Sequence, residues 1–262
     1  MKITKNESYL LGVANLKKID RDVGEEVIEN LSEISPELSQ MIVSYVFGEI
    51  YERPTIDLRT KEIAIVSSLI ALDKKPQLKV HLNAALNVGL SISELHEIII
   101  QMSVYCGFPS AVEAAKTYKE VLDQRRLGGK IDEVGVKGKS TPEEEKLNKG
   151  KEILQELGVV SPESLEKAFQ DVSPDFLNYV FQFGFGEVVS RSGLGLRERE
   201  IATIAALTAL GVKDALKFHI QGALNLGISK AEIAEVLITS SVFCGFPKAT
   251  TGIMILKELQ NE

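Results

Sequence analysis

The chain carries an internal repeat at an interval of 138 residues, and this repeat constrains its fold more than any other feature. The segment VYCGFPSA at 104–111 returns as VFCGFPKA at 242–249. The same interval relates further matching residues over most of the chain without a gap, including two histidines and several glycines. Repeats of solenoid proteins are only about 20–50 residues long. The sequence therefore predicts two tandem copies of one domain-length module.

The boundary between the copies is predicted from a change in composition. The segment QRRLGGKIDEVGVKGKS at 124–140 is rich in glycine and charge and has weak periodicity, which is typical of a connector. We therefore expect a first module at 1–123, a linker at 124–140 and a second module at 141–262.

Each module is expected to be an all-α bundle of about six helices. Serine followed by proline, an N-cap with proline at the first helical position, occurs at Ser35, Ser161 and Ser173. The segments SISE at 91–94 and SKAE at 229–232 match the capping-box pattern. Alternation with a period of two residues, which would indicate strands, is scarce.

Composition excludes several classes of protein. A net charge of −7 argues against a nucleic-acid partner. The apolar runs, such as IAIVSSLIAL at 63–72, are too short to span a bilayer. No secretory signal is apparent at the N-terminus, and two cysteines imply no disulfide framework. We expect a cytoplasmic protein with no nucleic-acid or membrane partner.

Two histidines are the first candidates for catalysis, because they occupy equivalent positions in the repeat. His81 and His219 each lie nineteen residues after a glutamate, Glu62 and Glu200, that begins an apolar helix. A Glu–His pair between successive helices would suit proton transfer. The alternative is a core histidine bonded to backbone and a glutamate that only stabilises a helix N-terminus.

A second polar set begins with the glutamate that closes each copy of the tripeptide FGE and continues with two arginines. It comprises Glu49, Arg53 and Arg59 in the first module and Glu187, Arg191 and Arg197 in the second. Arginines near a carboxylate could bind an anionic substrate. They could equally form ion pairs that join helix ends.

The cysteines lie in the repeated CGFP segment, which we interpret as a corner between two helices. Gly107 would end the first helix and Pro109 would begin the next. Cys106 and Cys244 are then expected to be small buried hydrophobic residues, with a reactive thiol as the alternative. The sequence shows no metal-ligand cluster and no phosphate-binding loop, so we expect no metal and no cofactor.

Taken together, FGE, RxxE, HxxxALNxG, a capping box and CGFP, each present twice, resemble the carboxymuconolactone decarboxylase family. That family also contains the AhpD-type alkylhydroperoxidases. The resemblance implies an all-helical fold and a homo-oligomer. A chain with two modules would form a trimer that imitates a hexamer of single modules.

The resemblance leaves two chemistries open. The AhpD-type peroxidases carry a CxxC motif just before the histidine. Here the corresponding positions hold Lys74 and Gln77 in the first module, and Val212 and Ala215 in the second. Without two neighbouring cysteines, a dithiol–disulfide cycle of that type cannot run. A thiol-dependent peroxidase is therefore disfavoured, and a non-catalytic helical scaffold is a further alternative.

The decarboxylase branch implies loss of CO₂ from a small anionic substrate, a carboxylated lactone, without a cofactor. His81 or Glu49 would then protonate the dienolate, and Arg53 or Arg59 would hold the carboxylate or the enolate oxygen. The residues expected to do the same in the second module are Glu187, Arg191, Arg197 and His219. Glu62 departs from this pattern, because it matches the proton relay of the peroxidase branch.

Overall fold

The structure, a computed structural model, describes residues 5–19 and 23–259, and every regular element in these ranges is a helix. The first half contains α1 (Lys5–Ile19), α2 (Val23–Ile34), α3 (Pro36–Met41), the π-helix η1 (Ile42–Ile50), α4 (Leu58–Ala71), α5 (Lys75–Asn87), α6 (Ile92–Tyr105) and α7 (Phe108–Leu127). The predicted all-α fold is confirmed, with no strand among the described residues.

The second half repeats this order. It contains the 3₁₀ turn η2 (Glu143–Glu145), α8 (Lys146–Leu157), α9 (Pro162–Phe169), α10 (Pro174–Tyr179), the π-helix η3 (Val180–Val189), α11 (Leu196–Leu210), α12 (Lys213–Asn225), α13 (Lys230–Cys244) and α14 (Phe246–Glu258). Both ends of α5 and α12 are separated by 138 residues, as are both ends of α3 and α10. The predicted internal repeat is confirmed.

Most of the predicted helix starts are present. Ser91 and Ser229 form complete capping boxes, and Ser161 accepts a hydrogen bond from the Ser164 amide. Ser35 and Ser173 precede a helix-starting proline, but neither side chain caps the helix, so that part of the prediction is wrong. At the first of these junctions the Ser35 amide donates to the Leu31 carbonyl (2.8 Å), because the chain passes from α2 into α3 with its helical bonding almost continuous.

The CGFP segments form the predicted corners. Gly107, with φ of 84°, joins α6 to α7, and Gly245, with φ of 83°, joins α13 to α14. A positive φ is readily adopted only by glycine, which explains why glycine is repeated there. Each following helix begins at phenylalanine, one residue earlier than predicted.

The glycine of each FGE tripeptide lies where two helices touch. A Cβ atom on Gly48 would stand 1.9 Å from the Ser8 carbonyl oxygen of α1, and one on Gly186 would stand 2.0 Å from the Lys146 carbonyl oxygen of α8. No side chain fits at such distances. The repeated tripeptide therefore serves close contact between the π-helix and the first long helix of its half.

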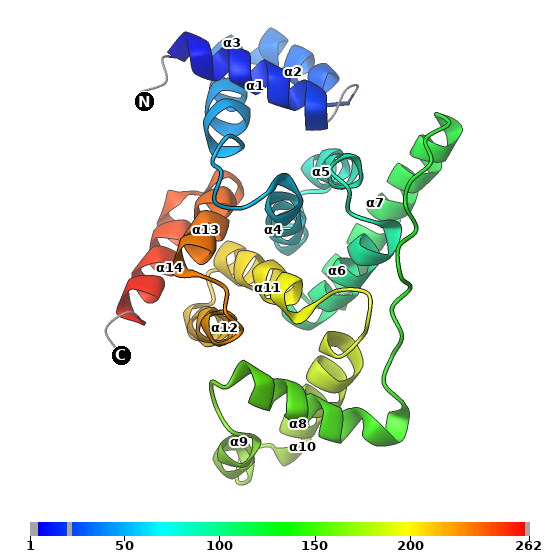
Figure 1. Ribbon diagram of the computed structural model, residues 1–262, viewed down its shortest axis with the longest axis vertical. Helices are drawn as coiled ribbons and strands as arrows, with labels where there is room; N and C mark the ends of the chain where they lie inside the picture. Colours follow the sequence, from blue (N-terminus) through cyan, green and yellow to red (C-terminus); the bar gives the residue numbers. More distant parts are fainter. Residues whose placement is uncertain (1–4, 20–22, 260–262) are drawn as a thin grey trace.

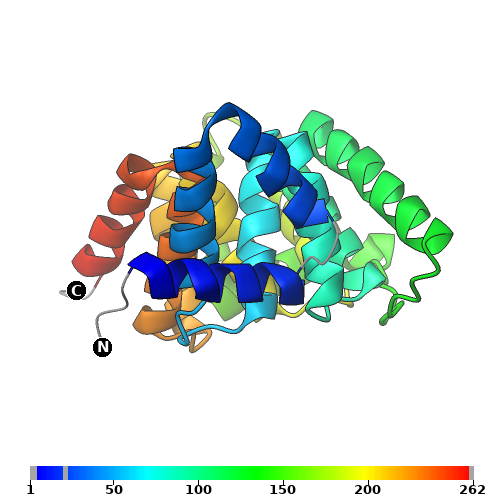
Figure 2. The same ribbon diagram turned by 90° about the horizontal axis from the view of Figure 1, so that it is seen from above.

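The two halves share one hydrophobic core. Helix α4 packs along α11 at the centre of the molecule, α13 packs on α4, and α6 packs on α11 (Figure 1). The largest cluster of buried hydrophobic residues draws members from both halves, among them Ile65 and Ile204, which are fully buried. Seen from above, α1 and η1 lie over the central helices (Figure 2). Helices of one half thus complete the surroundings of helices in the other.

The connector is tied to the surface along its length. Helix α7 continues through residues 124–127, and the chain then descends without regular structure to η2 (Figure 1). The amides of Ile92 and Ser93 donate to the carbonyls of Glu133 and Val134 (2.8 and 2.9 Å). Among the helices described, none has the length and apolar character needed to cross a membrane.

Candidate active site

Glu62 and His81 form a buried pair between α4 and α5. The Asp57 side chain caps α4 by accepting from the Thr60 amide (2.7 Å), which places Glu62 one turn into the helix. Glu62 Oε2 lies 3.0 Å from His81 Nδ1, and the two residues are 0% and 6% exposed. An ionised carboxylate can only accept, so Nδ1 carries the proton. The other ring nitrogen, Nε2, is left for a second partner.

The second half contains the same pair between α11 and α12. Glu200 Oε2 lies 2.9 Å from His219 Nδ1, and His219 is also 6% exposed. The structure therefore brings together both Glu–His pairs that the nineteen-residue spacing suggested.

Tyr51 adds a third polar group to the first pair. Its hydroxyl donates to Glu62 Oε1 (2.6 Å) and lies 3.5 Å from His81 Nδ1. Burial, followed by the negative charge of Glu62, raises the pKa of Tyr51 well above its ordinary value, so the group stays an O–H donor. The equivalent residue in the second half is Val189. Sequence reasoning missed Tyr51 because it is not repeated.

An aromatic residue from the opposite half covers each histidine. The Phe243 ring of α13 meets the His81 ring edge-on, with centroids 5.1 Å apart. The Tyr105 ring of α6 meets the His219 ring in the same way at 5.2 Å. Tyr105 and Phe243 are equivalent in the repeat and immediately precede the cysteines. Each Glu–His pair is therefore completed by the other half.

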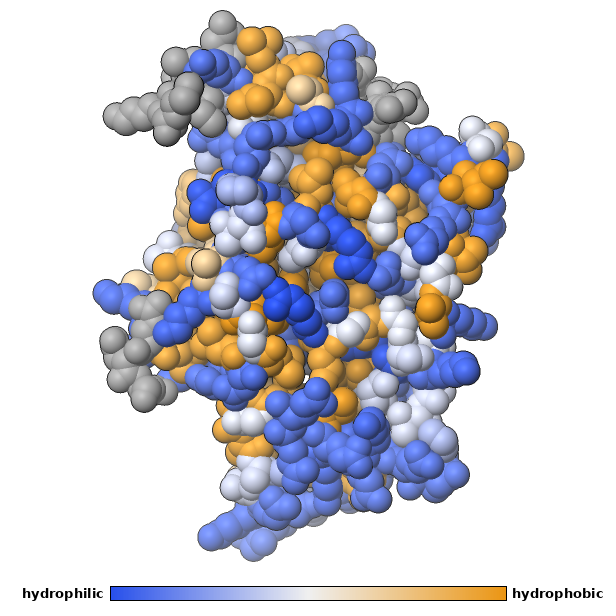
Figure 3. Space-filling view, in the orientation of Figure 1, coloured by the Kyte–Doolittle hydropathy of each residue, from blue (hydrophilic) through white to orange (hydrophobic). Residues whose placement is uncertain are grey.

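His81 lines an apolar pocket of about 490 Å³. Its lining residues come from α1, α2, α3, η1, α5 and α13, and are Leu16, Ile28, Leu31, Leu38, Ile42, Val46, Phe47, Gln77, Val80, His81, Val242 and Phe243. On the face shown in Figure 3, hydrophobic side chains are visible between α1 and the central helices. The size is typical of a site for a small molecule. His81 and Gln77 supply its polar side chains, so these two would orient a ligand.

The glutamates of the FGE tripeptides make other contacts. Exposed Glu49 accepts from the Ser8 hydroxyl (3.2 Å), and Glu187 pairs with Lys146 (2.7 Å) and Arg191 (3.5 Å). Neither lines the pocket beside His81. The structure joins His81 to Glu62 instead.

The four candidate arginines each have a carboxylate partner. Arg53 Nε lies 2.5 Å from Glu235 Oε1, and Arg191 Nε lies 3.0 Å from Glu97 Oε2. Arg59 and Arg197 pair with the capping-box glutamates Glu94 and Glu232. None of the four belongs to the lining of the pocket described above. Their role in substrate binding stays a prediction, and their observed role is to join helices.

The pairs of Arg53 and Arg191 connect the two halves. Buried Glu97 of α6 receives both Arg191 and Arg199, and the Arg199 Nη1 atom also donates to Gln101 (2.9 Å). In the other direction, Glu235 of α13 receives Arg53. Sequence reasoning did not identify these two glutamates, although Glu97 and Glu235 are equivalent in the repeat, because they lie 94 to 182 residues from their arginine partners.

The two thiols lie in settings that keep them protonated. Cys106 Sγ lies 3.8 Å from Met102 Sδ, and burial raises the pKa of Cys106 to about 12. Burial also raises the pKa of Cys244, whose Sγ contacts the Gly245 carbonyl (3.7 Å). A thiolate is the reactive form, so this geometry does not favour thiol chemistry at neutral pH.

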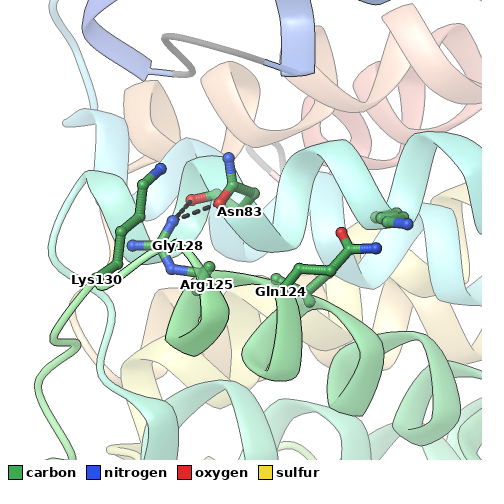
Figure 4. Close-up of a pocket in the computed structure, with 7 residues that line it drawn as sticks. Asn83, Gln124, Arg125, Gly128 and Lys130 are labelled. Atoms are coloured by element: carbon green, nitrogen blue, oxygen red, sulfur yellow. Dashed lines mark hydrogen bonds between the residues drawn. The ribbon is translucent and has the colours of Figure 1, made fainter.

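A second hollow, of about 220 Å³, lies between α5 and α7, and Figure 4 shows its polar lining. Arg125 dominates it, but its guanidinium is already bound by Asp132 (Nε to Oδ2, 2.8 Å) and by Asn83 and Asn87. We interpret these contacts of Arg125 as structural, because they join Asp132 of the connector to α5. Within the described ranges, no group of three or more His, Cys, Asp or Glu residues could hold a metal ion.

Comparison with known proteins gives consistent results. The family model described as "Carboxymuconolactone decarboxylase family" matches residues 36–120 and again 174–258. A 4-carboxymuconolactone decarboxylase of Acinetobacter baylyi is 32% identical over 118 residues, which are 45% of this chain and 88% of that protein. A nitrosuccinic acid decarboxylase of Metarhizium robertsii is 28% identical over 116 residues, 41% of this chain and 81% of that protein.

Each of these relatives thus matches less than half of this chain over most of its own length. The two family matches are separated by the same 138 residues that relate the Glu–His pairs and the CGFP corners. The fold and the repeat agree with these matches in both halves. The chain belongs to the carboxymuconolactone decarboxylase family.

Proposed function

We propose that this protein is a carboxy-lyase that removes CO₂ from a small carboxylated lactone bound beside His81. The observation that carries the proposal is the buried Glu62–His81 pair in the wall of an apolar pocket of about 490 Å³. Two relatives that bear decarboxylase names support the class of reaction. The lactone itself is taken from the first of these names.

The proposed reaction needs one proton donor and one electron acceptor. The bond between the ring carbon and the carboxylate breaks, and its electron pair passes into the conjugated ring carbonyl, which gives CO₂ and a dienolate. The Nε2–H of protonated His81 then delivers a proton to carbon. Glu62 stabilises the imidazolium through Nδ1–H and fixes the ring orientation. Because the substrate accepts the electrons, this chemistry requires no organic cofactor.

The apolar lining contributes to the same step. Phe47, Val80 and Phe243 line the same pocket as the imidazole and offer no polar side-chain atom to a bound carboxylate. A carboxylate loses hydration when it enters such a space, whereas the charge of the dienolate is spread over several atoms. Apolar surroundings therefore destabilise the bound carboxylate more than the dienolate that forms on loss of CO₂.

Substrate binding by Arg53 or Arg59, which the sequence suggested, is a separate part of the proposal. Arg53 would have to leave Glu235, and Arg59 would have to leave Glu94, before either could bind the substrate. The geometry favours Gln77 and His81 as the groups that orient the ligand.

A direct assay tests the proposal. The protein is incubated with 4-carboxymuconolactone and with nitrosuccinic acid, and released CO₂ is measured. A saturated carboxylated γ-lactone is the matched control, since it has no conjugated carbonyl to accept electrons. We expect CO₂ from 4-carboxymuconolactone and none from the control. No CO₂ from either activated acid would contradict the proposal, and CO₂ from nitrosuccinic acid alone would contradict the assignment of a lactone substrate.

A further inference from the structure

The two halves surround their histidines with side chains of different size. Three aliphatic residues that line the first pocket, Leu31, Leu38 and Val80, correspond to Phe169, Phe176 and Phe218 in the second half. A fourth aliphatic residue, Val43 of η1, lies outside that lining and corresponds to Phe181. Three lining residues are replaced by smaller ones, Val180 for Ile42, Gly184 for Val46 and Ala215 for Gln77, and these replacements remove fewer atoms than the phenylalanines add.

Three of these phenylalanines belong to a separate packed cluster, whereas Phe176 is 57% exposed. Phe181 is fully buried and forms the centre of this cluster with Leu154 and Leu177. The rings of Phe169 and Phe176 stack with centroids 6.2 Å apart, and Phe169 and Phe218 pack against the cluster. Helices α8, α9 and α10, which supply half of its residues, lie together at the lower end of Figure 1.

Position 218 is the point at which this cluster reaches the histidine. The Phe218 ring meets the His219 ring edge-on with centroids 5.2 Å apart, and the Tyr105 ring meets it edge-on at the same distance. In the first half the equivalent Val80 lines the open pocket, and Phe243 is the one aromatic ring in edge-on contact with the His81 ring among the described residues, while Tyr51 approaches through its hydroxyl. Two aromatic rings therefore pack edge-on against His219, whereas one packs against His81.

We infer that the two Glu–His pairs are not equivalent: the first half holds the ligand, and Phe218 with its neighbours fills the corresponding space in the second half. Val80 and Phe218 are the residues that determine which half is open. The Glu200–His219 pair then acts as a buried link between α11 and α12. The inference takes its reaction from the proposed function, but the difference in pocket space stands without it.

The lining also defines the ligand class. The open pocket has aliphatic and aromatic walls, one amide (Gln77) and one imidazole (His81). Its volume fits a ligand of one or two rings. The ligand is therefore a compact carboxylic acid with an apolar body, its acid group oriented by His81.

Ligand binding can be followed at each histidine separately. The full chain is labelled with ¹⁵N-histidine, and its ring signals are recorded while 1-naphthoate is added; calorimetry gives the number of sites. His96, which is exposed, is an internal reference. We expect one site per chain and a shift of the His81 signals alone. Val80→Phe should abolish binding, and Phe218→Val should add a second site with a shift at His219.

The inference would be overturned by any one of four results. These are equal shifts at His81 and His219, two equal sites, unchanged binding by Val80→Phe, and no binding at either histidine. Val80→Phe creates no cavity, so the test does not depend on whether Phe218→Val folds. The readout is independent of turnover. Binding at His81 alone without CO₂ release from any acid would retain this inference and reject the proposed function.

Discussion

Glu62 is the residue on which the first site depends, because two donors from different elements meet at its carboxylate. Tyr51 follows η1 and His81 belongs to α5, yet their donor atoms lie 2.6 and 3.0 Å from the two oxygens of one fully buried group. A buried carboxylate is stable only when such donors satisfy it. The same donors fix the orientation of the imidazole ring.

Tyr51→Phe is predicted to destabilise the protein. Phenylalanine keeps the ring but leaves Glu62 Oε1 without its O–H donor, which costs about 1–3 kcal/mol for a buried acceptor. Urea unfolding measures the loss. Tyr45→Phe on η1 is the matched control, since Tyr45 packs edge-on against Phe246, and a smaller change is expected there. Equal stability of wild type and Tyr51→Phe would contradict the assigned hydrogen bond.

The thiols are predicted to be dispensable. The doubly substituted chain Cys106→Ser/Cys244→Ser should retain its decarboxylase activity within about threefold, because both thiols are protonated at neutral pH and neither lines the pocket. Iodoacetamide labelling of the folded wild type at pH 7.5 should be slow compared with labelling in urea. Loss of activity in the substituted chain would favour the thiol-dependent alternative.

At the scale of elements, helices α6 and α13 link the halves. Each carries a buried glutamate, Glu97 or Glu235, that binds an arginine following the π-helix of the opposite half. Each also places an aromatic ring, Tyr105 or Phe243, against the opposite histidine. Each of these two helices therefore both joins the halves and supplies an aromatic ring beside the histidine of the opposite half.

Glu97→Gln is predicted to be among the most destabilising single substitutions. It leaves Arg199, 1% exposed, without its charged partner, and breaking a buried ion pair in this way costs about 3–5 kcal/mol. Urea unfolding is again the measurement. Glu113→Gln removes an ion pair at the surface and serves as the control, with no measurable change expected. Similar stabilities of the two variants would contradict the structural role of Glu97.

The elements that were predicted correctly are those governed by local chemistry. Capping boxes at Ser91 and Ser229 and glycine corners at Gly107 and Gly245 depend on residues within one turn, so the sequence contains the needed information. The π-helices η1 and η3 were not predicted, because they arise where Gly48 and Gly186 let another helix approach.

Within the candidate site, the sequence predicted the members that are repeated. Glu62 and His81 were found because Glu200 and His219 repeat their spacing. Tyr51 has no equivalent tyrosine, and Phe243 contacts His81 only because α13 packs across the molecule. Such contacts depend on how the halves pair, which a repeat alone does not determine.

At the scale of the whole molecule, the largest hydrophobic cluster crosses the boundary between the repeats. The same burial that builds this core holds several weak acids in their neutral forms. It raises the pKa of Tyr51, Tyr105 and Tyr118 above the ordinary tyrosine value, and that of Cys106 to about 12.

Stability is therefore predicted to fall in alkaline solution. In the unfolded chain cysteine ionises near pH 8.5 and tyrosine near pH 10, whereas the folded chain keeps these protons. The stabilising contribution is complete below those values and is lost as the pH rises toward the folded-state pKa values. Urea unfolding between pH 8 and pH 11 should show a steady decrease. Tyr118→Phe should make the decrease shallower, and a stability independent of pH in this range would contradict the assigned burial.

The central claim is that His81 delivers the proton in a decarboxylation. The most direct test is the rate of CO₂ release by His81→Asn, with folding checked by circular dichroism and with His96→Asn, an exposed histidine outside both sites, as the control. We predict a decrease in kcat of about 10²–10⁴-fold for His81→Asn and an unchanged rate for the control. A folded His81→Asn protein that releases CO₂ at the wild-type rate would contradict the account.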